Sequence, residues 1–360
     1  MMSFGPGLGR RRRRPGSKVR YREAGGEVTT MKARQARQVR LLGAATTTTV
    51  LTVALSGCVT VHGETAVVPA VSKSEAKKVL ERFSKTSNKA NRTFDVKLNT
   101  TVETGALGAI DQAGLKSRKK VQPGGNPGYK SLRLSDERFL IPKQAGWPKF
   151  FVADTQTNRM RNGRWLFVFQ RDSADAPWKA SYLAVIENTE MPEFAFGKGG
   201  YAKAVPGTSG HGLTLSPDEL SDAYVSYLRD GEGEDDFAPG EHTSKRRAQR
   251  QGAENRPGRR TEFADQAAKA PQYAPFALRT KDGGALVFFA SHHHSKETFA
   301  EGYKPPVKDP LLKALMTGKP KQSVTYVRVS EQAVTVPAKK DGGQVGFLNR
   351  IDGLTSAKGE

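Results

Sequence analysis

The sequence contains very little cysteine, since Cys58 is the single cysteine among 360 residues. One thiol cannot form an intramolecular disulfide, so the fold must be held together by its hydrophobic core. Long hydrophobic runs are lacking too. The uncharged stretch 41–55 is shorter than the roughly 20 apolar residues that a membrane-crossing helix needs. These two absences argue against a disulfide scaffold and against a helical membrane-spanning protein.

Sequence signatures of catalysis are also scarce. The segment GTSGHG at 207–212 places Ser209 two residues before His211, but that histidine replaces the second glycine of a nucleophile elbow. GKGG at 197–200 lacks the spacing and the Lys-Ser/Thr ending of a phosphate-binding loop. The acidic stretch 230–236 lacks the alternating ligand pattern of a calcium loop. We therefore predict neither a catalytic residue nor a cofactor from motifs.

The residues around Cys58 explain why one cysteine is kept. A basic segment at 31–40 is followed by the uncharged stretch 41–55 and then by small residues, as in a secretory signal peptide, which we place at 31–57. The segment also resembles the lipobox of bacterial lipoproteins, which reads Leu, a small residue, Gly or Ala, and Cys. All four positions match: Leu55, Ser56, Gly57 and Cys58. The resemblance implies that the Cys58 thiol is lipidated through a thioether; the alternative is a leader followed by an unmodified cysteine.

Residues 1–30 precede a signal peptide that is already complete, and signal peptides begin at the N-terminus. We therefore interpret Met31 as the translation start and residues 1–30 as a mis-assigned leader. The four residues at 26–29 can be back-translated to a string typical of a ribosome-binding site just upstream of the Met31 codon. On this interpretation the arginine run at 10–14 has no role in the protein.

Basic residues outnumber acidic ones. The chain has 58 Lys and Arg against 36 Asp and Glu, and residues 1–57 contain 12 of these cations and 2 of these acids, so the mature part keeps a net charge of +12. A nucleic-acid partner is not expected outside the membrane, whereas anionic lipids, wall polymers and acidic proteins are available there. We predict a protein that is lipid-anchored on the outer face of the cell membrane.

The mature chain is expected to start with a tether at 58–71 and to continue with two α+β domains. We place the first domain at 72–206, a linker at 207–215 and the second domain at 216–360. Each half has the order of a capped helix, a hairpin and further strands, which favours two similar domains. A single larger α+β domain is the alternative, because length is only a weak guide to domain count.

Capping boxes predict where the two main helices begin. Ser72 to Glu75 and Ser216 to Glu219 both have a serine followed three residues later by glutamate, and apolar residues at helical spacing follow each box. Strand-like text follows each helix, with hairpins across the turns at 161–163 and 282–284. Between them, the charged segment 230–260 lacks apolar spacing and is predicted to be a mobile loop.

Several segments of the mature chain resemble uncharacterised secreted lipoproteins of actinobacteria. The resemblance rests on the lipobox, the capped helix and three segments at 102–114, 139–153 and 176–185. It implies no activity and no functional residues. The order of a helix followed by a curved sheet also resembles two tandem cystatin-like folds of the nuclear-transport-factor kind. Such folds host binders, enzymes and oligomerisation modules, so the fold alone would not give the function.

Three histidines in a row, 292–294, are the one candidate for metal binding. If the preceding strand continues, His292 and His294 point to the same side and could chelate zinc or copper. Glu297, Glu241 and His242 are available as further ligands, but the sequence does not bring them close. The alternative is a solvated strand end or loop.

The sequence thus favours a binding or interaction module at the cell envelope. A ligand would lie on the concave, aromatic face of a curved sheet, near one or more of these residues: Trp147, Trp165, Phe167 and Trp178. The alternative for these aromatics is that they only form the core. The alternative is an enzyme that uses such a pocket for acid–base or hydrolytic chemistry, which would need a buried carboxylate or histidine with a shifted pKa. Anionic envelope polymers or lipids are candidate partners of four arginines of the charged segment: Arg246, Arg247, Arg259 and Arg260. The alternative is that this basic segment only pairs with the acidic run at 230–236.

Overall fold

The computed structural model describes residues 66–208 and 212–360. The predicted start, signal peptide and lipobox, together with Cys58, lie outside the described residues, and so do Ser209 and His211. The described residues belong to one compact unit. In the described part, no helix is both long and apolar enough to cross a membrane.

Three helices open the described chain: α2 (Lys73–Thr93), α3 (Val96–Asn99) and α4 (Gly105–Val121). The Ser72 hydroxyl caps α2 by accepting from the backbone N–H of Glu75 at 3.1 Å, as predicted. A capping box also predicts that the Glu75 carboxylate bonds back to the Ser72 backbone N–H. This part of the prediction is wrong, because the Glu75 carboxylate instead accepts a hydrogen bond from the Trp178 indole N–H at 3.0 Å. That contact ties the start of α2 to the sheet beneath it.

The first sheet is antiparallel, with strand order β2-β4-β5-β6. Its strands are β2 (Leu134–Leu140), β4 (Lys149–Thr157), β5 (Met160–Arg171) and β6 (Lys179–Glu187). Strand β5 is apolar on both faces: Phe167 and Phe169 pack under α2, and Leu166 and Val168 pack toward the second sheet. The predicted hairpin is confirmed, but its turn lies at 158–159, and the predicted turn residues 161–163 belong to β5. A minor sheet pairs β1 (Val68–Pro69) with β3 (Lys143–Gln144).

The second half adds helices α5 (Leu220–Asp230), α6 (Ser244–Glu254) and α7 (Pro310–Leu315), with the short 3-10 turn η1 (Glu234–Asp236). Helix α5 begins at Leu220, later than its capping box predicts, and only the Glu219 carboxylate bonds back to the Ser216 N–H. The prediction of a loop is wrong for residues 244–254, which form α6. Arg250 replaces the apolar anchor that the pattern lacks, because its buried guanidinium pairs with Asp265.

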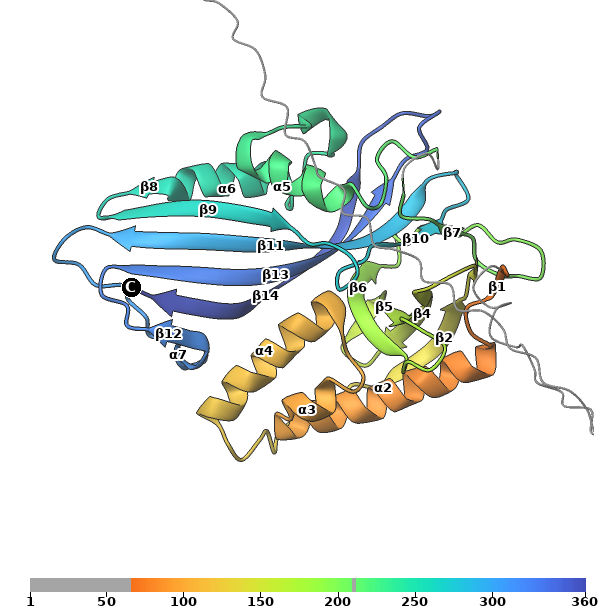
Figure 1. The fold of residues 1–360 in the computed structure, drawn as a ribbon, viewed down its shortest axis with the longest axis horizontal. Helices are drawn as coiled ribbons and strands as arrows, with labels where there is room; N and C mark the ends of the chain where they lie inside the picture. The colour runs from red at the N-terminus through yellow and green to blue at the C-terminus, as the bar shows by residue number, and fades with distance from the viewer. Residues whose placement is uncertain (1–65, 209–211) are drawn as a thin grey trace, which may run out of the picture. The chain divides into compact units, whose positions relative to one another are not determined.

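The second sheet is dominated by long curled antiparallel strands (Figure 1). These are β9 (Arg259–Ala267), β11 (Ala285–Phe299), β13 (Ser323–Val336) and β14 (Gly346–Gly359), joined by β7 (Ala204–Val205), β8 (Asn255–Arg256), β10 (Phe276–Arg279) and β12 (Met316–Gly318). Strand β13 is continuous through Ser330 and Glu331, which pair with both β11 and β14.

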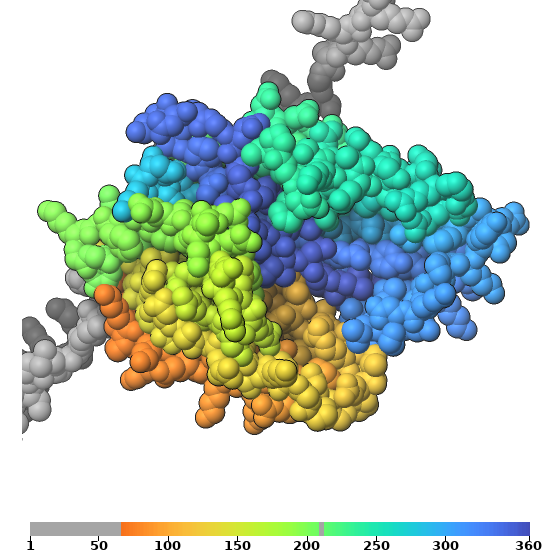
Figure 2. Space-filling view, turned by 180° about the vertical axis from the view of Figure 1, so that it is seen from behind, coloured from red at the N-terminus to blue at the C-terminus, as the bar shows by residue number. Residues whose placement is uncertain are grey.

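The two sheets meet at the edge strand β6 and share one core. The Leu183 N–H of β6 donates to Glu331 of β13 at 3.0 Å, and the Val185 N–H donates to Asn349 of β14 at 3.2 Å. Helix α4 packs against β6, β13 and β14 together. Viewed from behind, the yellow segments of the first half lie directly against the blue strands of the second (Figure 2). The α+β prediction is confirmed, whereas the two-domain division and the cystatin-like assignment stay predictions.

Candidate functional site

A cavity of about 260 Å³, which we call the acidic pocket, lies where α2 and α4 cover the junction of the two sheets. Its apolar walls are formed by Phe83, Leu107, Ile110, Leu132, Trp165, Phe167, Leu183 and Ile351. Its polar lining is formed by Ser87, Asn91, Glu103, Asp111, Arg118, Tyr129, Arg159 and Glu331. Apolar walls with a few convergent polar groups are typical of small-molecule sites.

Helix α4 supplies one side of the pocket through its periodicity. Leu107, Asp111 and Arg118 recur at intervals of four and seven residues and therefore share a helix face. Gly105 begins the helix with φ +57°, and a Cβ there would lie 3.1 Å from Ser181 on β6. Only glycine readily allows this turn, which brings Glu103 and α4 close to the sheet edge.

Two buried glutamates form the inner end of the acidic pocket. Glu103 is 2 % exposed and accepts one hydrogen bond, from the Ser87 hydroxyl at 3.1 Å. Glu331 is 1 % exposed and accepts one, from the Leu183 backbone N–H. Part of the role of Glu331 is structural, because it satisfies a free N–H at the edge of β6. The other carboxyl oxygen, Glu331 Oε1, has no hydrogen-bond partner in the described structure.

Burial raises the pKa of all three carboxyl groups in the pocket. For Glu103 burial and the charge of Asp111 raise the pKa well above its usual value. For Asp111 burial raises the pKa, while a hydrogen bond with Glu103 and the charges of Arg118 and Arg159 oppose the rise. For Glu331 burial is again the main cause, with smaller contributions from Asp111 and Glu103. Two neighbouring carboxyls that both resist ionisation tend to share one proton.

Two buried polar atoms of this pocket, Glu331 Oε1 and Trp165 Nε1, have no hydrogen-bond partner in the described structure, and Glu103 Oε2 has no donor other than the neighbouring Asp111 carboxyl. Leaving a buried donor or acceptor unpaired costs about 1–3 kcal/mol per group. A polar molecule or water in the cavity would satisfy them.

The expected ligand position is only partly matched. Trp165 and Phe167 do line the acidic pocket, with ring centroids 6.0 Å apart. Trp178 is instead a buried core residue, and Trp147 lies under the cationic ends of Lys149 and Arg171. The three carboxyl groups were not predicted, because Glu103, Asp111 and Glu331 belong to no motif and come together only through tertiary packing.

The three histidines lie within a strand, because β11 continues through them. His292 and His294 share a face, and His292 packs edge-on against Tyr273 at 4.9 Å. Within the described residues, no group of three or more His, Cys, Asp or Glu is arranged to hold a metal ion. Glu297 pairs with Arg259, and Glu241 pairs with Lys245.

His293 takes part in a buried hydrogen-bond chain that the sequence did not suggest. Gln332 Nε2 donates to Ser291 Oγ at 2.7 Å, Ser291 is 2.8 Å from His293 Nε2, and His293 Nδ1 is 2.7 Å from Asp265. Burial lowers the pKa of His293 to about 4, so the ring is neutral near pH 7. Burial alone would raise the pKa of Asp265, but hydrogen bonds from His293 and Arg250 lower it to about 2.

This hydrogen-bond chain has the connectivity of a catalytic triad, but a substrate could not reach its serine. Ser291 is fully buried, at 0 % exposure, and His293 is 4 % exposed. The cavity that reaches Asp265 does not include either of them. We therefore interpret the chain as a structural network that fixes α6 and β9 on the sheet.

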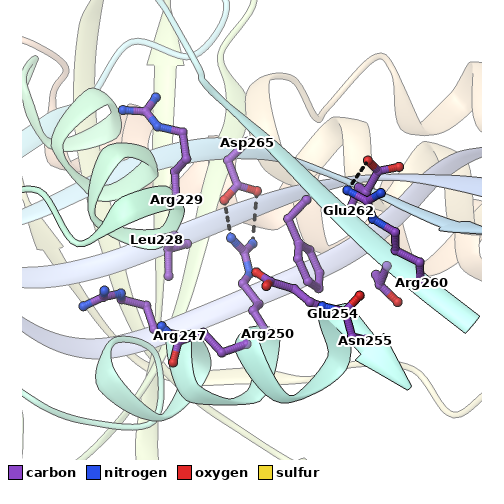
Figure 3. Close-up of a pocket in the computed structure, with 12 residues that line it drawn as sticks. Leu228, Arg229, Arg247, Arg250, Glu254, Asn255, Arg260, Glu262 and Asp265 are labelled. Carbon is purple, nitrogen blue, oxygen red and sulfur yellow. Dashed lines mark hydrogen bonds and ion pairs between the residues drawn. The ribbon is translucent and has the colours of Figure 1, made fainter. Parts of the chain in front are cut away.

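That neighbouring cavity, of about 630 Å³, is the α6–β9 groove (Figure 3). It is larger than the acidic pocket, but its arginines already have carboxylate partners. Figure 3 shows Arg250 reaching from α6 to Asp265, and Arg260 pairing with Glu262. The other three arginines that were expected to contact the envelope are also engaged. Arg247 covers the Tyr227 ring, Arg259 pairs with Glu297, and Arg246 is partly buried. The groove is thus a weaker candidate for a ligand than the acidic pocket.

The chain is similar in sequence to lipoproteins of Streptomyces. The chain is 46% identical over 312 residues to an uncharacterized lipoprotein of Streptomyces coelicolor, covering 87% of this chain and 93% of that protein. An uncharacterized lipoprotein of Streptomyces avermitilis is also 46% identical, over 313 residues with the same coverage. Another from S. coelicolor is 27% identical over 298 residues, covering 81% of this chain and 82% of that protein.

The expected resemblance to uncharacterised actinobacterial lipoproteins is therefore confirmed. A family described as a domain of unknown function matches residues 67–359, which is nearly all of the described chain. The chain belongs to this family, DUF8094, and its Streptomyces relatives are lipoproteins.

Proposed function

We propose that this lipoprotein is an envelope-anchored binding protein that holds a small polar molecule in the acidic pocket. The anchor would be the lipidated Cys58, left at the N-terminus after removal of the signal peptide at 31–57. The protein would then face outward from the cell membrane, where solutes of the envelope reach it directly. Each half would be a cystatin-like unit, with the pocket at their junction.

The observation that carries this proposal is the presence of two unpaired polar atoms around one cavity, the acceptor Glu331 Oε1 and the indole donor of Trp165. The Glu103 carboxyl, which is shared with Asp111, lines the same cavity. A bound molecule with both donors and acceptors would satisfy both unpaired atoms at once. The aromatic faces of Trp165 and Phe167 would cover its apolar part.

The size of the cavity limits the ligand. About 260 Å³ is below the roughly 300–1,000 Å³ of sites for drug-sized molecules. A lipid chain or a polymer would not fit inside. The same volume also holds several water molecules, so an experiment must separate a ligand from water.

An acid–base enzyme is the second candidate, and one observation favours it. The Glu103 and Asp111 carboxyls are hydrogen-bonded neighbours whose pKa values are both raised, chiefly by burial. Such a pair can hold one proton and deliver it to a bound molecule. Binding is common to both candidates, and only turnover of the ligand distinguishes them.

Native mass spectrometry of the lipoprotein extracted from its own membrane tests the proposal. We expect an added mass of a small molecule on the wild-type protein. Trp165→Phe removes one indole donor from the pocket and should reduce the ligand-bound fraction roughly tenfold, which corresponds to about 1.4 kcal/mol. Trp178→Phe is the matched control, because its indole bonds to Glu75 outside the pocket.

Equal bound fractions in the two variants would place the ligand elsewhere, and a wild-type protein with no added mass would leave only water in the pocket. Either result would contradict the proposal. A ligand that is chemically converted during incubation would favour the enzyme.

A further inference from the structure

We propose that the occupant of the acidic pocket is a zwitterion, with its ammonium group at Glu103 and Glu331 and its anionic group at Arg118 and Arg159. This inference rests on the proposed function and names the ligand class. It follows from the way charges are distributed along the pocket.

The inner end of the pocket offers acceptors. Glu103 and Glu331 are 2 % and 1 % exposed; Glu331 has one carboxyl oxygen without a partner in the described structure, and Glu103 shares a hydrogen bond with Asp111. An ammonium group carries three N–H donors and no acceptor, so it complements these carboxyl oxygens. A bound cation would favour the ionised form of the carboxyls, which burial alone disfavours.

The aromatic wall suits the same group. Trp165 and Phe167 lie side by side on β5 and both line the cavity. A cation near the face of such rings is attracted by the negative charge of the ring face, most strongly where water is excluded. A neutral polyol could donate hydrogen bonds to the carboxyl oxygens, but it has no positive charge for the aromatic rings to attract.

The outer end of the pocket carries two arginines and one carboxyl group. Arg118 on α4 and Arg159 at the β4–β5 turn are exposed residues that line the same cavity, and the charges of both act on Asp111. Neither arginine forms an ion pair with Asp111 within 4.0 Å in the described structure, so both guanidinium groups keep donors for a ligand. Arg159 is held in place by the Tyr129 hydroxyl at 3.3 Å and lies over the Tyr129 ring. A planar guanidinium in a fixed position is well suited to a carboxylate or phosphate group.

The Trp165 indole adds a third requirement. Its N–H is an unpaired donor, and indole has no acceptor to offer. It would bond to an oxygen of the ligand, which an amine without an anionic group lacks. Among small molecules, a zwitterion meets the needs of both ends of the pocket and of this donor.

A further cavity leaves room at the outer end. This space of about 320 Å³, between α4, α7 and β14, shares Ile110, Asp111 and Arg118 with the acidic pocket. The anionic end of a ligand can therefore extend past Arg118. The separation of the two charges is thus a property to be measured.

Four probes of similar length separate the ligand classes. Norvaline and 5-aminopentanoate are isomeric zwitterions with different charge separations, pentylamine carries only the ammonium group, and pentanoate carries only the carboxylate. Affinities are measured by calorimetry on the mature lipoprotein in detergent. We expect one zwitterion to bind at least roughly tenfold more tightly than both single-charge probes.

Substitutions then assign the two ends. Glu331→Gln should remove the advantage of the zwitterion over pentanoate, with Glu103→Gln as a second variant if the first misfolds. Arg159→Gln should remove its advantage over pentylamine. Arg161→Gln, near the same turn but outside the pocket lining, is the control and should change neither ratio.

A single-charge probe that binds as tightly as the better zwitterion would overturn the inference, as would a failure of both zwitterions to bind. The proposed function would survive that failure if native mass spectrometry still shows a small molecule lost in Trp165→Phe. A pocket that contains only water would overturn both.

Discussion

At the scale of single residues, the molecule is distinguished by carboxyl groups buried without counter-ions. Ion pairs elsewhere follow the usual rule that a buried charge is paired: Arg164 is 6 % exposed and bonds to Asp154 and Asp136. Glu103 and Glu331 break that rule. Such exceptions occur preferentially at functional sites, where a shifted pKa serves binding or chemistry.

The buried Glu331 predicts how stability depends on pH. Because burial raises its pKa in the folded protein, this group stabilises the fold fully below the unfolded-state pKa, and that stability is lost as pH rises through the folded-state pKa. Glu331→Gln is neutral at every pH and keeps an oxygen for the Leu183 N–H. We expect the variant to melt higher than wild type at pH 8, by about 2–4 °C per kcal/mol gained, and to match it at pH 4.

Thermal unfolding of both proteins across this pH range checks the prediction. Glu137→Gln, at an exposed position, serves as the control. A wild-type protein whose melting temperature tracks that of Glu331→Gln at every pH would show that Glu331 has no raised pKa.

At the scale of elements, the anchoring of α6 is the main surprise. The helix has a single buried residue, Arg250, whose guanidinium reaches Asp265 on β9, and Asp265 bonds in turn to His293 on β11. Breaking a buried ion pair by removing one partner costs about 3–5 kcal/mol. Arg250→Gln should therefore release α6 from the sheet.

Limited trypsin digestion measures this release. Wild type should resist cleavage after Lys245, Arg246 and Arg247, whereas Arg250→Gln should be cut there at least roughly tenfold faster. Arg256→Gln, at an exposed position, should behave like wild type. Rapid cleavage of the wild-type protein at these sites would contradict an anchored helix.

The same helix shows what sequence patterns can and cannot predict. Helix α2, the β4–β5 hairpin and the β10–β11 hairpin carry local signals, namely a capping serine, apolar strand residues and, for β10–β11, a glycine turn, and all three elements are confirmed. The predicted place of the β4–β5 turn is wrong, because Gly163 lies within β5. Helix α6 carries no such signal, because one long-range ion pair replaces its apolar stripe. The acidic pocket was missed for the same reason: Trp165 and Phe167 were visible as aromatics, whereas Glu103 and Glu331 meet only when β6 docks beside β13.

At the scale of the whole molecule, a lipid anchor on Cys58 would decide where the pocket works. Cys58→Ser should abolish lipidation, because a hydroxyl cannot form the thioether, and the precursor should accumulate uncleaved. Metabolic labelling with a fatty acid measures the outcome. Label retained on the substituted protein would show that the attachment site lies elsewhere.

The basic surface leads to a second prediction at this scale. A polybasic stretch near an anionic surface contributes on the order of 1 kcal/mol per cation and is screened by salt. If α6 and β9 contact the envelope, a lipid-free protein starting at Glu64 should bind anionic vesicles and purified wall in a salt-sensitive way. Binding should drop at least roughly tenfold when Arg246, Arg247, Arg259 and Arg260 become Gln. Equal binding by the wild-type protein and the variant would show that these four arginines do not contact the envelope.

The most direct test of the binding account is the indole N–H resonance of Trp165. The protein has three tryptophans, so each indole can be assigned in a ¹H–¹⁵N spectrum by Trp→Phe substitution. We compare the lipoprotein as extracted from its membrane with a sample whose mass shows that it carries no small molecule. The account predicts that the Trp165 indole shifts between the two samples and that the Trp178 indole, bonded to Glu75, does not. A Trp165 resonance that is identical in both samples would contradict a ligand in the acidic pocket.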